Sequence, residues 1–305
     1  MAFAAEVKSE LCRVPIQRRC CARAEAYGIL LYANRFTSDE VRIVTENSAF
    51  VKRLPLLFQK AFQMDFDQLP SLKEEISGKQ VFQILQREKI HALINHLGFD
   101  PRQSAVLHIN FGLLEERCCQ DAFLRGAFLA GGSVTDPKKC YHLELVTGHM
   151  KVSREMEVLL GEMGYQARST LRNGNQVIYF KQSRIIEELL TRAGAPVCAL
   201  EVMTAKVEKD LSNQVNRRVN CETANVDKAV DAAQQQISAI RRLAEAGVLE
   251  TLSQTLQETA IARMYYPEFT LQELADSFDP PISKSCLNHR MRKLMSLAKE
   301  PPSQA

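Results

Sequence analysis

The sequence has 305 residues, of which 46% are hydrophobic and 25% are charged, and its formal net charge at pH 7 is +3. This length predicts two or three domains, and the absence of an apolar run of roughly 18 residues excludes a membrane-spanning helix. A charge of +3 is too small to indicate nucleic-acid binding by itself, so the distribution of charge along the chain is the more informative property.

The N-terminal stretch and the cysteines favour a cytoplasmic protein. Residues 1–11 are amphipathic and contain acidic side chains, without the basic start and apolar core of a signal peptide. Nine cysteines form an odd number spread over a long chain, which predicts free thiols in a reducing compartment. The adjacent pairs Cys20-Cys21 and Cys118-Cys119 lack the Cys-x-x-Cys spacing of zinc ribbons. A metal site is therefore disfavoured; we expect small buried residues at helix starts, and no metal or cofactor.

One stretch in the middle of the chain predicts a buried helix with a stop signal. Small residues recur every four positions at Ala122, Gly126 and Ala130, so one stripe of the helix carries almost no side chain. A glycine inside a helix costs about 1 kcal/mol relative to alanine, so Gly126 indicates the close approach of another backbone. Gly131 and Gly132 are expected to end the helix in the left-handed conformation that glycine adopts readily.

An internal repeat predicts the partner of this helix. Residues 19–34 match residues 117–132 at an offset of 98 positions, with identical Arg, Cys, Cys, Gly and Leu, and the offset pairs Gly126 with Gly28. Two copies about a hundred residues apart indicate a duplicated domain with pseudo-two-fold symmetry. Coincidence between two apolar helices is the alternative, which the rare Cys-Cys pair in both copies disfavours. We expect an N-terminal domain at residues 1–205, with repeats at about 1–100 and 101–198.

Each copy is predicted to contain an opening helix, two strands, a helix, further strands and a closing helix. In the first copy the later elements are expected at residues 40–45, 48–62, 64–69, 80–85 and 88–97, with Ser77-Gly78 splitting the two hairpin segments. In the second copy they are expected at residues 133–137, 142–147, 152–163, 165–171, 176–180 and 183–193, with an Asn173-Gly174 hairpin turn. Gly98, Gly164 and Gly194 are the predicted helix stops.

The C-terminal part of the chain predicts a helix-turn-helix. Residues 206–223 are polar and asparagine-rich and are interpreted as a linker, followed by helices at 223–246, which Gly247 ends, and at 253–265. Thr270 and Glu273 form a capping box at the start of a short helix, and Ser283 caps a longer helix at 284–298 after a break at 279–282. This order is typical of a helix-turn-helix at about residues 270–300, within a domain at 224–305.

The final helix concentrates positive charge in an otherwise acidic domain. It has no acidic residue between Ser283 and Lys299, which favours contact with phosphates. Its N-terminal residues are placed to reach base edges, and its later cations to bind phosphates. The candidate DNA-binding residues are Ser283, Lys284, Ser285, Asn288, His289, Arg290, Arg292 and Lys293. Leu287, Met291, Leu294 and Leu297 form the stripe that is expected to pack on the preceding helix. The alternative is a solvated basic helix, which the capped helix and tight turn upstream disfavour.

The repeated helices resemble the LAGLIDADG motif of homing endonucleases, with residues 124–132 as the closer copy. The resemblance implies an α+β fold in which duplicated αββαββα repeats place two helices along a pseudo-dyad and saddle-shaped sheets over DNA. In that family an acidic residue at the end of each helix holds the catalytic metal. Those positions correspond to Ala33 and Gly131, and neither can bind a metal. The resemblance therefore implies a body without nuclease activity.

The whole chain resembles the WhiA (DUF199) family of bacterial DNA-binding regulators. The matching segments are Cys-Cys with Phe-Leu-Arg-Gly-Ala-Phe-Leu-Ala-Gly-Gly-Ser-Val at residues 118–134, Asn-Arg-Arg-Val-Asn-Cys-Glu-Thr-Ala-Asn at 216–225, and Asp-Pro-Pro-Ile-Ser-Lys-Ser-Cys-Leu-Asn-His-Arg-Met-Arg-Lys-Leu at 279–294. Cys286 stands where the family is expected to have glycine, which bears on fine specificity and not on the fold.

This resemblance implies a sequence-specific, non-enzymatic transcription regulator that binds double-stranded DNA and is linked to cell division, chromosome segregation and sporulation. It also implies cytoplasmic, nucleoid-associated localisation, and other transcription regulators or RNA polymerase as candidate partners. Two alternatives stay open. One is a homing-type nuclease that uses displaced acids such as Asp39 or Asp136. The other is an interaction platform in which only the C-terminal domain contacts DNA.

Overall fold

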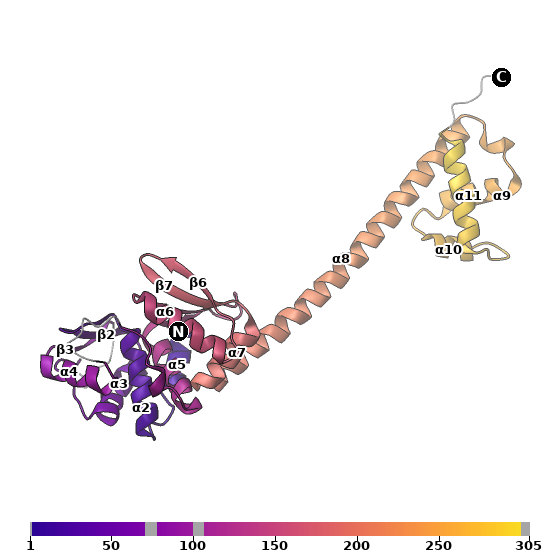
Figure 1. Cartoon of the computed structure of the whole chain (residues 1–305). Helices are drawn as coiled ribbons and strands as arrows, with labels where there is room; N and C mark the ends of the chain where they lie inside the picture. The colour runs from indigo at the N-terminus through magenta and orange to yellow at the C-terminus, as the bar shows by residue number, and fades with distance from the viewer. Residues whose placement is uncertain (1, 71–77, 100–106, 300–305) are drawn as a thin grey trace. The chain divides into compact units, whose positions relative to one another are not determined.

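The computed structural model describes residues 2–70, 78–99 and 107–299, and the chain divides into two compact units (Figure 1). The first unit ends at Asp210 and the second begins at Leu211. Each unit has a hydrophobic core of its own. The predicted fold class is confirmed: an α+β N-terminal body built from two repeats, followed by an all-α helix-turn-helix region.

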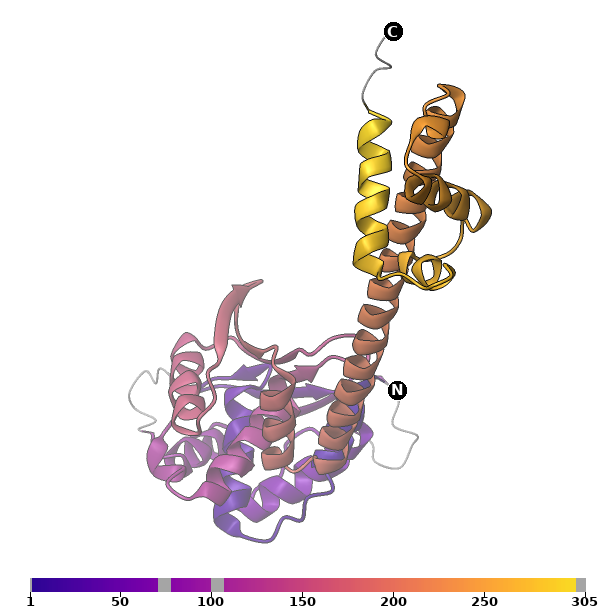
Figure 2. The same cartoon turned by 90° about the vertical axis from the view of Figure 1, so that its right-hand side faces the viewer.

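The first unit contains a similar order of elements twice, with one strand fewer among the described residues of the first copy. After α1 (Phe3–Leu11), the first copy comprises α2 (Arg19–Leu31), β1 (Arg35–Phe36), β2 (Val41–Thr45), α3 (Ser48–Phe62), β3 (Gln80–Ile84) and α4 (Arg87–His96). After the short 3-10 helix η1 (Phe111–Leu113), the second copy comprises α5 (Arg117–Gly131), β4 (Gly132–Val134), β5 (Leu143–Thr147), α6 (Met150–Glu162), β6 (Arg168–Arg172), β7 (Asn175–Phe180) and α7 (Ser183–Ala193). The strands of the unit gather on one side and most of its helices on the other (Figure 2).

Both sheets are antiparallel, and the second copy is the more regular of the two. Its four strands have the order β4-β5-β7-β6, with Leu145 opposite Ile178. The first copy has the order β1-β2-β3 among the described residues, and the strand expected at 64–69 is wrong apart from one isolated bridge, Gln68 to Gln83. The Asp67 carboxylate explains this, because it accepts hydrogen bonds from the backbone after β3. Ser77 of the expected turn lies outside the described residues.

Four of the predicted helix stops are confirmed, whereas the glycines at the end of α5 are present for a different reason. Gly98, Gly164, Gly194 and Gly247 all have positive φ and follow helix ends. At the end of α5, however, the expectation of a left-handed residue is wrong. Gly131 is still helical, and Gly132 is extended with φ −88° and ψ 147°. A Cβ on Gly131 would collide with the Val146 carbonyl oxygen and the Tyr32 ring, so lack of space requires glycine at this position.

The second unit begins within a 50-residue helix, α8 (Pro196–Glu245). It continues with a short 3-10 helix, η2 (Leu249–Thr251), and with α9 (Gln254–Tyr265), α10 (Leu271–Asp276) and α11 (Lys284–Leu297). The residues interpreted as a linker, 206–223, are thus helical. Their side chains are mostly exposed, as their polarity indicates, but no glycine or proline interrupts residues 197–246. Most of these residue types are compatible with a helix, so α8 continues through the segment although few of its side chains are buried.

A buried ion network joins the two repeats. The Glu25 carboxylate on α2 accepts two hydrogen bonds from Arg53 on α3, at 2.6 and 2.8 Å, and one from Arg125 on α5, at 2.9 Å. In addition, Arg53 Nη1 donates to the carbonyl oxygens of Cys12 and Val14, and Arg125 Nη1 donates to that of Ala193. We call Arg53, Glu25 and Arg125 the buried triad. Because both guanidinium groups contact the same carboxylate and also donate to backbone carbonyl oxygens, burial is tolerated.

Candidate nucleic-acid interface

Two capped helices and the turn between them form the helix-turn-helix. The Thr270 hydroxyl accepts a hydrogen bond from the Glu273 backbone N–H, and the Glu273 carboxylate accepts one from the Thr270 N–H, which completes the predicted capping box of α10. The Ser283 hydroxyl accepts a hydrogen bond from the Cys286 N–H at 3.2 Å and begins α11. These caps fix the point at which α11 leaves the turn.

The apolar face of α11 anchors the helix in the second core. Leu287, Met291 and Leu294 are buried there, and Leu297 packs against them. The core is completed by Ile240 and Leu243 from α8, Leu256 and Ala260 from α9, and Leu274 and Ala275 from α10. Arg263 at the end of α9 is also buried, and it donates a hydrogen bond to the Phe269 carbonyl oxygen at 2.6 Å. Its contact ties the connection between α9 and α10 to this core.

The opposite face of α11 is exposed and cationic. Each residue of a helix turns by about 100°, so Ser285, His289 and Arg292 point away from the buried stripe, with Lys293 beside them. All four side chains are exposed, as are Ser283 and Lys284 at the start of the helix. Asn288 and Arg290 lie on the flanks and are half-buried. None of these side chains takes part in an ion pair among the described residues. The side chains of Lys284, His289, Arg292 and Lys293 thus face solvent.

In the first unit, α2 and α5 lie against each other with their backbones in contact. A Cβ on Gly126 would collide with the Glu25 carbonyl oxygen and lie 3.1 Å from the Ile29 nitrogen. A Cβ on Gly28 would collide with the Phe123 carbonyl oxygen. Ala130, on the same stripe of α5, is half-buried and packs against the core of the unit. The two glycines therefore form the crossing point of the helix pair.

The C-terminal ends of this helix pair carry no carboxylate. A cavity of about 460 Å³ lies beside Ala33 and Gly131, and its described lining contains neither Asp nor Glu. The lining includes Asn34 and Arg35 from the first copy and His149 from the second. Burial lowers the pKa of His149. The lining that the structure describes therefore lacks the carboxylate ligands that hold a nuclease metal.

The acids considered as displaced catalytic groups have other partners. Asp39 is exposed and forms an ion pair with Arg87 at 3.2 Å. Asp136 accepts a hydrogen bond from the Lys138 backbone N–H at 2.8 Å, so it serves as the turn former that its position before proline indicates. Neither lines the cavity at Ala33 and Gly131.

A group of basic residues beside this cavity was not singled out from the sequence. A larger hollow of about 1150 Å³ is lined by Lys8, Arg35, Arg42 and Lys79, together with one acid, Glu46. Burial lowers the pKa of Lys8 to about 8. The alternating pattern of β2 could have predicted that Arg42 is exposed. It could not have predicted the hollow, because α1, β1 and the segment before β3 come together only in the folded unit.

The vicinal cysteines are less buried than expected. Only Cys119 is buried; Cys21 and Cys118 are half-buried and Cys20 is exposed. The first turn of a helix is open at its end, so these side chains lie at the rim of the core. None of the nine cysteines is joined in a disulfide in this structure.

Among the described residues, no helix is long and apolar enough to cross a membrane. Comparisons with known proteins agree with the architecture described above. Two family models match the chain, the WhiA LAGLIDADG-like domain over residues 120–212 and the WhiA C-terminal HTH domain over residues 215–298. A relative from Ruminiclostridium cellulolyticum, named "Probable cell division protein WhiA", is 32% identical over 98% of this chain and 97% of its own length. A relative of the same name from Desulfitobacterium hafniense strain Y51 is 35% identical over 100% of this chain and 98% of its own.

The fold is also that of a solved structure. The crystal structure of full-length DUF199/WhiA from Thermatoga maritima has a TM-score of 0.60 with this chain, at 22% identity and with 98% of both chains covered. At this identity the likeness concerns the fold, while the curated relatives match nearly the whole sequence. The chain belongs to the WhiA family.

Proposed function

We propose that the chain is a sequence-specific, non-catalytic DNA-binding transcription regulator that acts in cell division. The observation that carries this proposal is the exposed cationic face of α11, held by two capped helices and free of acidic residues from Ser283 to Lys299. A helix presented in this way fits the major groove, where phosphate contacts supply affinity and base contacts supply specificity.

The residues of α11 divide into two roles in this proposal. Ser283, Lys284 and Ser285 at the start of the helix, with Asn288 and His289, approach base edges. Arg290, Arg292 and Lys293, farther along, bind phosphate oxygens. The exposure of His289 and Arg292 supports these roles most directly, because both lie on the face opposite the core. Asn288 and Arg290, which are half-buried, reach the DNA from the flanks of the helix.

The absence of nuclease activity is inferred from the ends of α2 and α5. Ala33 and Gly131 stand where homing endonucleases have their metal-binding acids, and the adjacent cavity has no described carboxylate. Metal-assisted phosphodiester cleavage requires such ligands. Supercoiled plasmid incubated with Mg²⁺ or Mn²⁺ should therefore stay intact, whereas nicking that Asp39→Asn or Asp136→Asn abolishes would contradict this part of the proposal.

The role in cell division comes to this chain from its relatives, which carry that name. The finer roles in chromosome segregation and sporulation, and the candidate partners among transcription regulators and RNA polymerase, are proposed from membership of the WhiA family. Regulation of transcription requires that the protein reside with the nucleoid in the cytoplasm. Mapping of the DNA that is bound across the genome would supply the target sites.

The DNA-binding proposal is tested by fluorescence anisotropy with the full chain, on a mapped site and on an unrelated duplex. Arg292→Ala and Lys293→Ala should weaken binding to both duplexes and reduce the slope of log K against log salt by about 0.9 for each phosphate that is no longer bound. His289→Ala and Asn288→Ala should instead reduce the preference for the mapped site. Lys228→Ala, an exposed lysine on α8, is the matched control and should leave both affinities unchanged. Equal affinities for all variants would overturn the assignment of α11.

The basic hollow in the first unit favours a second DNA contact over a platform that leaves DNA to the C-terminal region alone. Its exposed cations Arg42 and Lys79 lie near the helix ends from which homing endonucleases act on DNA. We expect the double variant Arg42→Ala/Lys79→Ala to weaken binding of the full chain to a long duplex. Lys52→Ala, exposed on α3, is the control. An unchanged affinity would favour the platform.

A further inference from the structure

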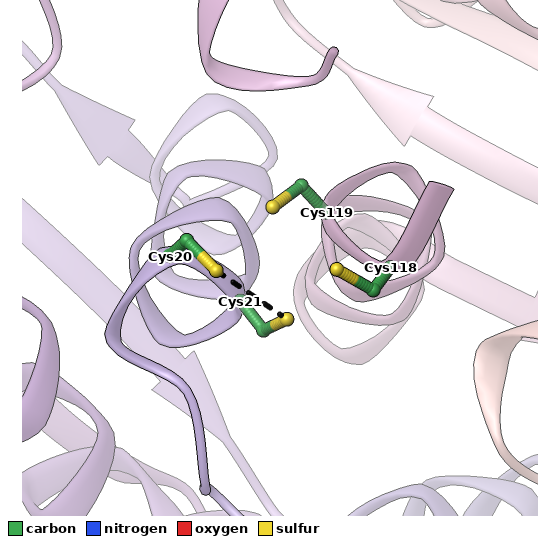
Figure 3. Close-up of side chains that lie close together, drawn as sticks. All are labelled: Cys20, Cys21, Cys118 and Cys119. Carbon is green, nitrogen blue, oxygen red and sulfur yellow. Dashed lines mark hydrogen bonds between the residues drawn. The ribbon is translucent and has the colours of Figure 1, made fainter. Parts of the chain in front are cut away.

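Four thiols from the two repeats meet at the N-terminal ends of α2 and α5. The sulfur atoms of these residues all lie within 4.8 Å of one another, and we call the group the cysteine tetrad: Cys20, Cys21, Cys118 and Cys119. Figure 3 shows the four side chains directed into the space between the two helix ends. Among the described residues, no other group of three or more Cys, His, Asp or Glu side chains converges in this way.

We propose that the cysteine tetrad is a structural Zn²⁺ site that joins the two repeats. A tetrahedral site with Zn–S bonds of about 2.3 Å places its sulfurs about 3.8 Å apart. The sulfur atoms of Cys20 and Cys21 are already 3.9 Å apart, and the largest separation in the tetrad is within 4.8 Å. Small rotations of the side chains therefore suffice, and neither helix has to move.

Both pairs of cysteines lie in the first turns of their helices. Cys20 and Cys21 are the second and third residues of α2, and Cys118 and Cys119 hold the same places in α5. Backbone N–H groups in the first turn and the positive end of the helix dipole stabilise negative charge there. Neither helix has an acidic residue in its first turn, and neither N-cap residue supplies a side-chain hydrogen bond. Two helix ends thus face one cluster of sulfur ligands.

Zn²⁺ is the cation that this ligand set favours. Four thiolates are soft ligands and select Zn²⁺ over Mg²⁺ or Ca²⁺, and a site closed by four protein ligands is structural because no position is left for a substrate. Packing alone does not account for the tetrad, since Cys20 is exposed and gains little from burial. The absence of a Cys-x-x-Cys motif is no obstacle, because each helix supplies two adjacent ligands.

The register of the helix pair explains why the four thiols meet. Cys21 precedes Gly28 by seven residues, and Cys119 precedes Gly126 by seven. Seven residues are about two helical turns, so equal distances from one crossing point bring the cysteines together at the same end of the pair. The opposite end holds Ala33 and Gly131. Neither repeat alone could complete the site, so zinc would link the first copy to the second.

Metal analysis of the full chain, purified without a metal-affinity tag under reducing conditions, tests the proposal. We expect about one zinc per chain, and X-ray absorption should show four sulfurs at about 2.3 Å. Cobalt titrated into the metal-free wild type should give the visible spectrum of tetrahedral sulfur coordination. Cys20→Ser and Cys118→Ser should each lower zinc affinity at least about 100-fold, since even the loss of an outer-shell partner costs 10–100-fold. Cys286→Ser, an exposed cysteine outside the tetrad, should retain the metal.

Four outcomes would overturn the proposal. The first is a chain that contains no zinc and does not bind cobalt. The second is a Cys20→Ser variant that binds zinc as tightly as Cys286→Ser. The third is iron in place of zinc, and the fourth is a disulfide within the tetrad of the reduced protein. If the variants fail to fold, the cobalt titration of the wild type still decides.

Discussion

Substitution of Gly126 by alanine tests whether backbone contact between α2 and α5 limits the stability of the first unit. The added methyl group would overlap the Glu25 carbonyl oxygen and lie 2.8 Å from its carbon. These are backbone atoms, which cannot rotate away, so the helices would have to move apart in a close-packed core. We estimate a cost of about 3 kcal/mol for overpacking and a gain of about 1 kcal/mol from helix propensity. The net loss is about 2 kcal/mol, which lowers the melting temperature of a unit of this size by about 4–8 °C.

Gly161 provides the matched control, because it is also a helical glycine in the first unit. It is exposed near the end of α6, and a Cβ there would meet nothing within 4 Å. Gly161→Ala should therefore gain up to about 1 kcal/mol and raise the melting temperature by up to about 4 °C. Differential scanning calorimetry of the two full-length variants compares the signs directly. A Gly126→Ala protein as stable as Gly161→Ala would refute close packing as the reason for the glycine.

Three further changes test other parts of the molecule. Glu25→Ala leaves the two arginines of the buried triad unpaired, and it should lower the free energy of unfolding of the first unit by about 3–5 kcal/mol in urea unfolding. The control is Glu188→Ala, which removes an exposed ion pair and should cost at most about 1 kcal/mol. Thr270→Ala removes the capping box and should cost the second unit about 1 kcal/mol; Ser253→Ala, at an N-cap without a capping bond, should cost less in the same melting experiment. Gly131→Asp should destabilise the first unit and restore no Mg²⁺-dependent nicking of plasmid DNA, because a Cβ already collides there.

Local sequence signals predicted most of the fold because they act over a few residues. The capping box at Thr270 and the positive φ of Gly98 and Gly164 are consequences of nearby backbone geometry. The repeat offset paired Gly28 with Gly126 because duplication preserves the residues at a crossing point. The continuity of α8 was not predicted, because the polar residues 206–223 were interpreted as a linker. Their residue types do not disfavour a helix.

Features that depend on tertiary contact were not predictable in the same way. Glycine is required both by positive φ and by lack of space, so the residue type at Gly131 could not distinguish the two causes. The cause is lack of space, because the side chain of Tyr32 and the backbone of β5 lie against Gly131. Both belong to other parts of the fold. The basic hollow at Arg42 and Lys79 likewise combines separate segments. Within α11, the exposed face could be predicted, because the buried stripe through Leu287 and Met291 determines it by periodicity alone.

The collision at Gly131 also bears on the proposed absence of a nuclease site. If only the acidic side chain were missing, the space for it would remain and an aspartate could be restored. Instead, the Val146 carbonyl oxygen of β5 and the Tyr32 ring occupy the position of a Cβ, and the Thr147 hydroxyl donates a hydrogen bond to the Leu31 carbonyl oxygen at 3.0 Å. A strand of the second repeat is thus bound to the helix end of the first, beside Ala33 and Gly131. On the proposal that Gly131 replaces a metal-binding acid, such packing leaves no room to restore that acid by substitution alone, and it stabilises the helix pair at the end opposite the cysteine tetrad.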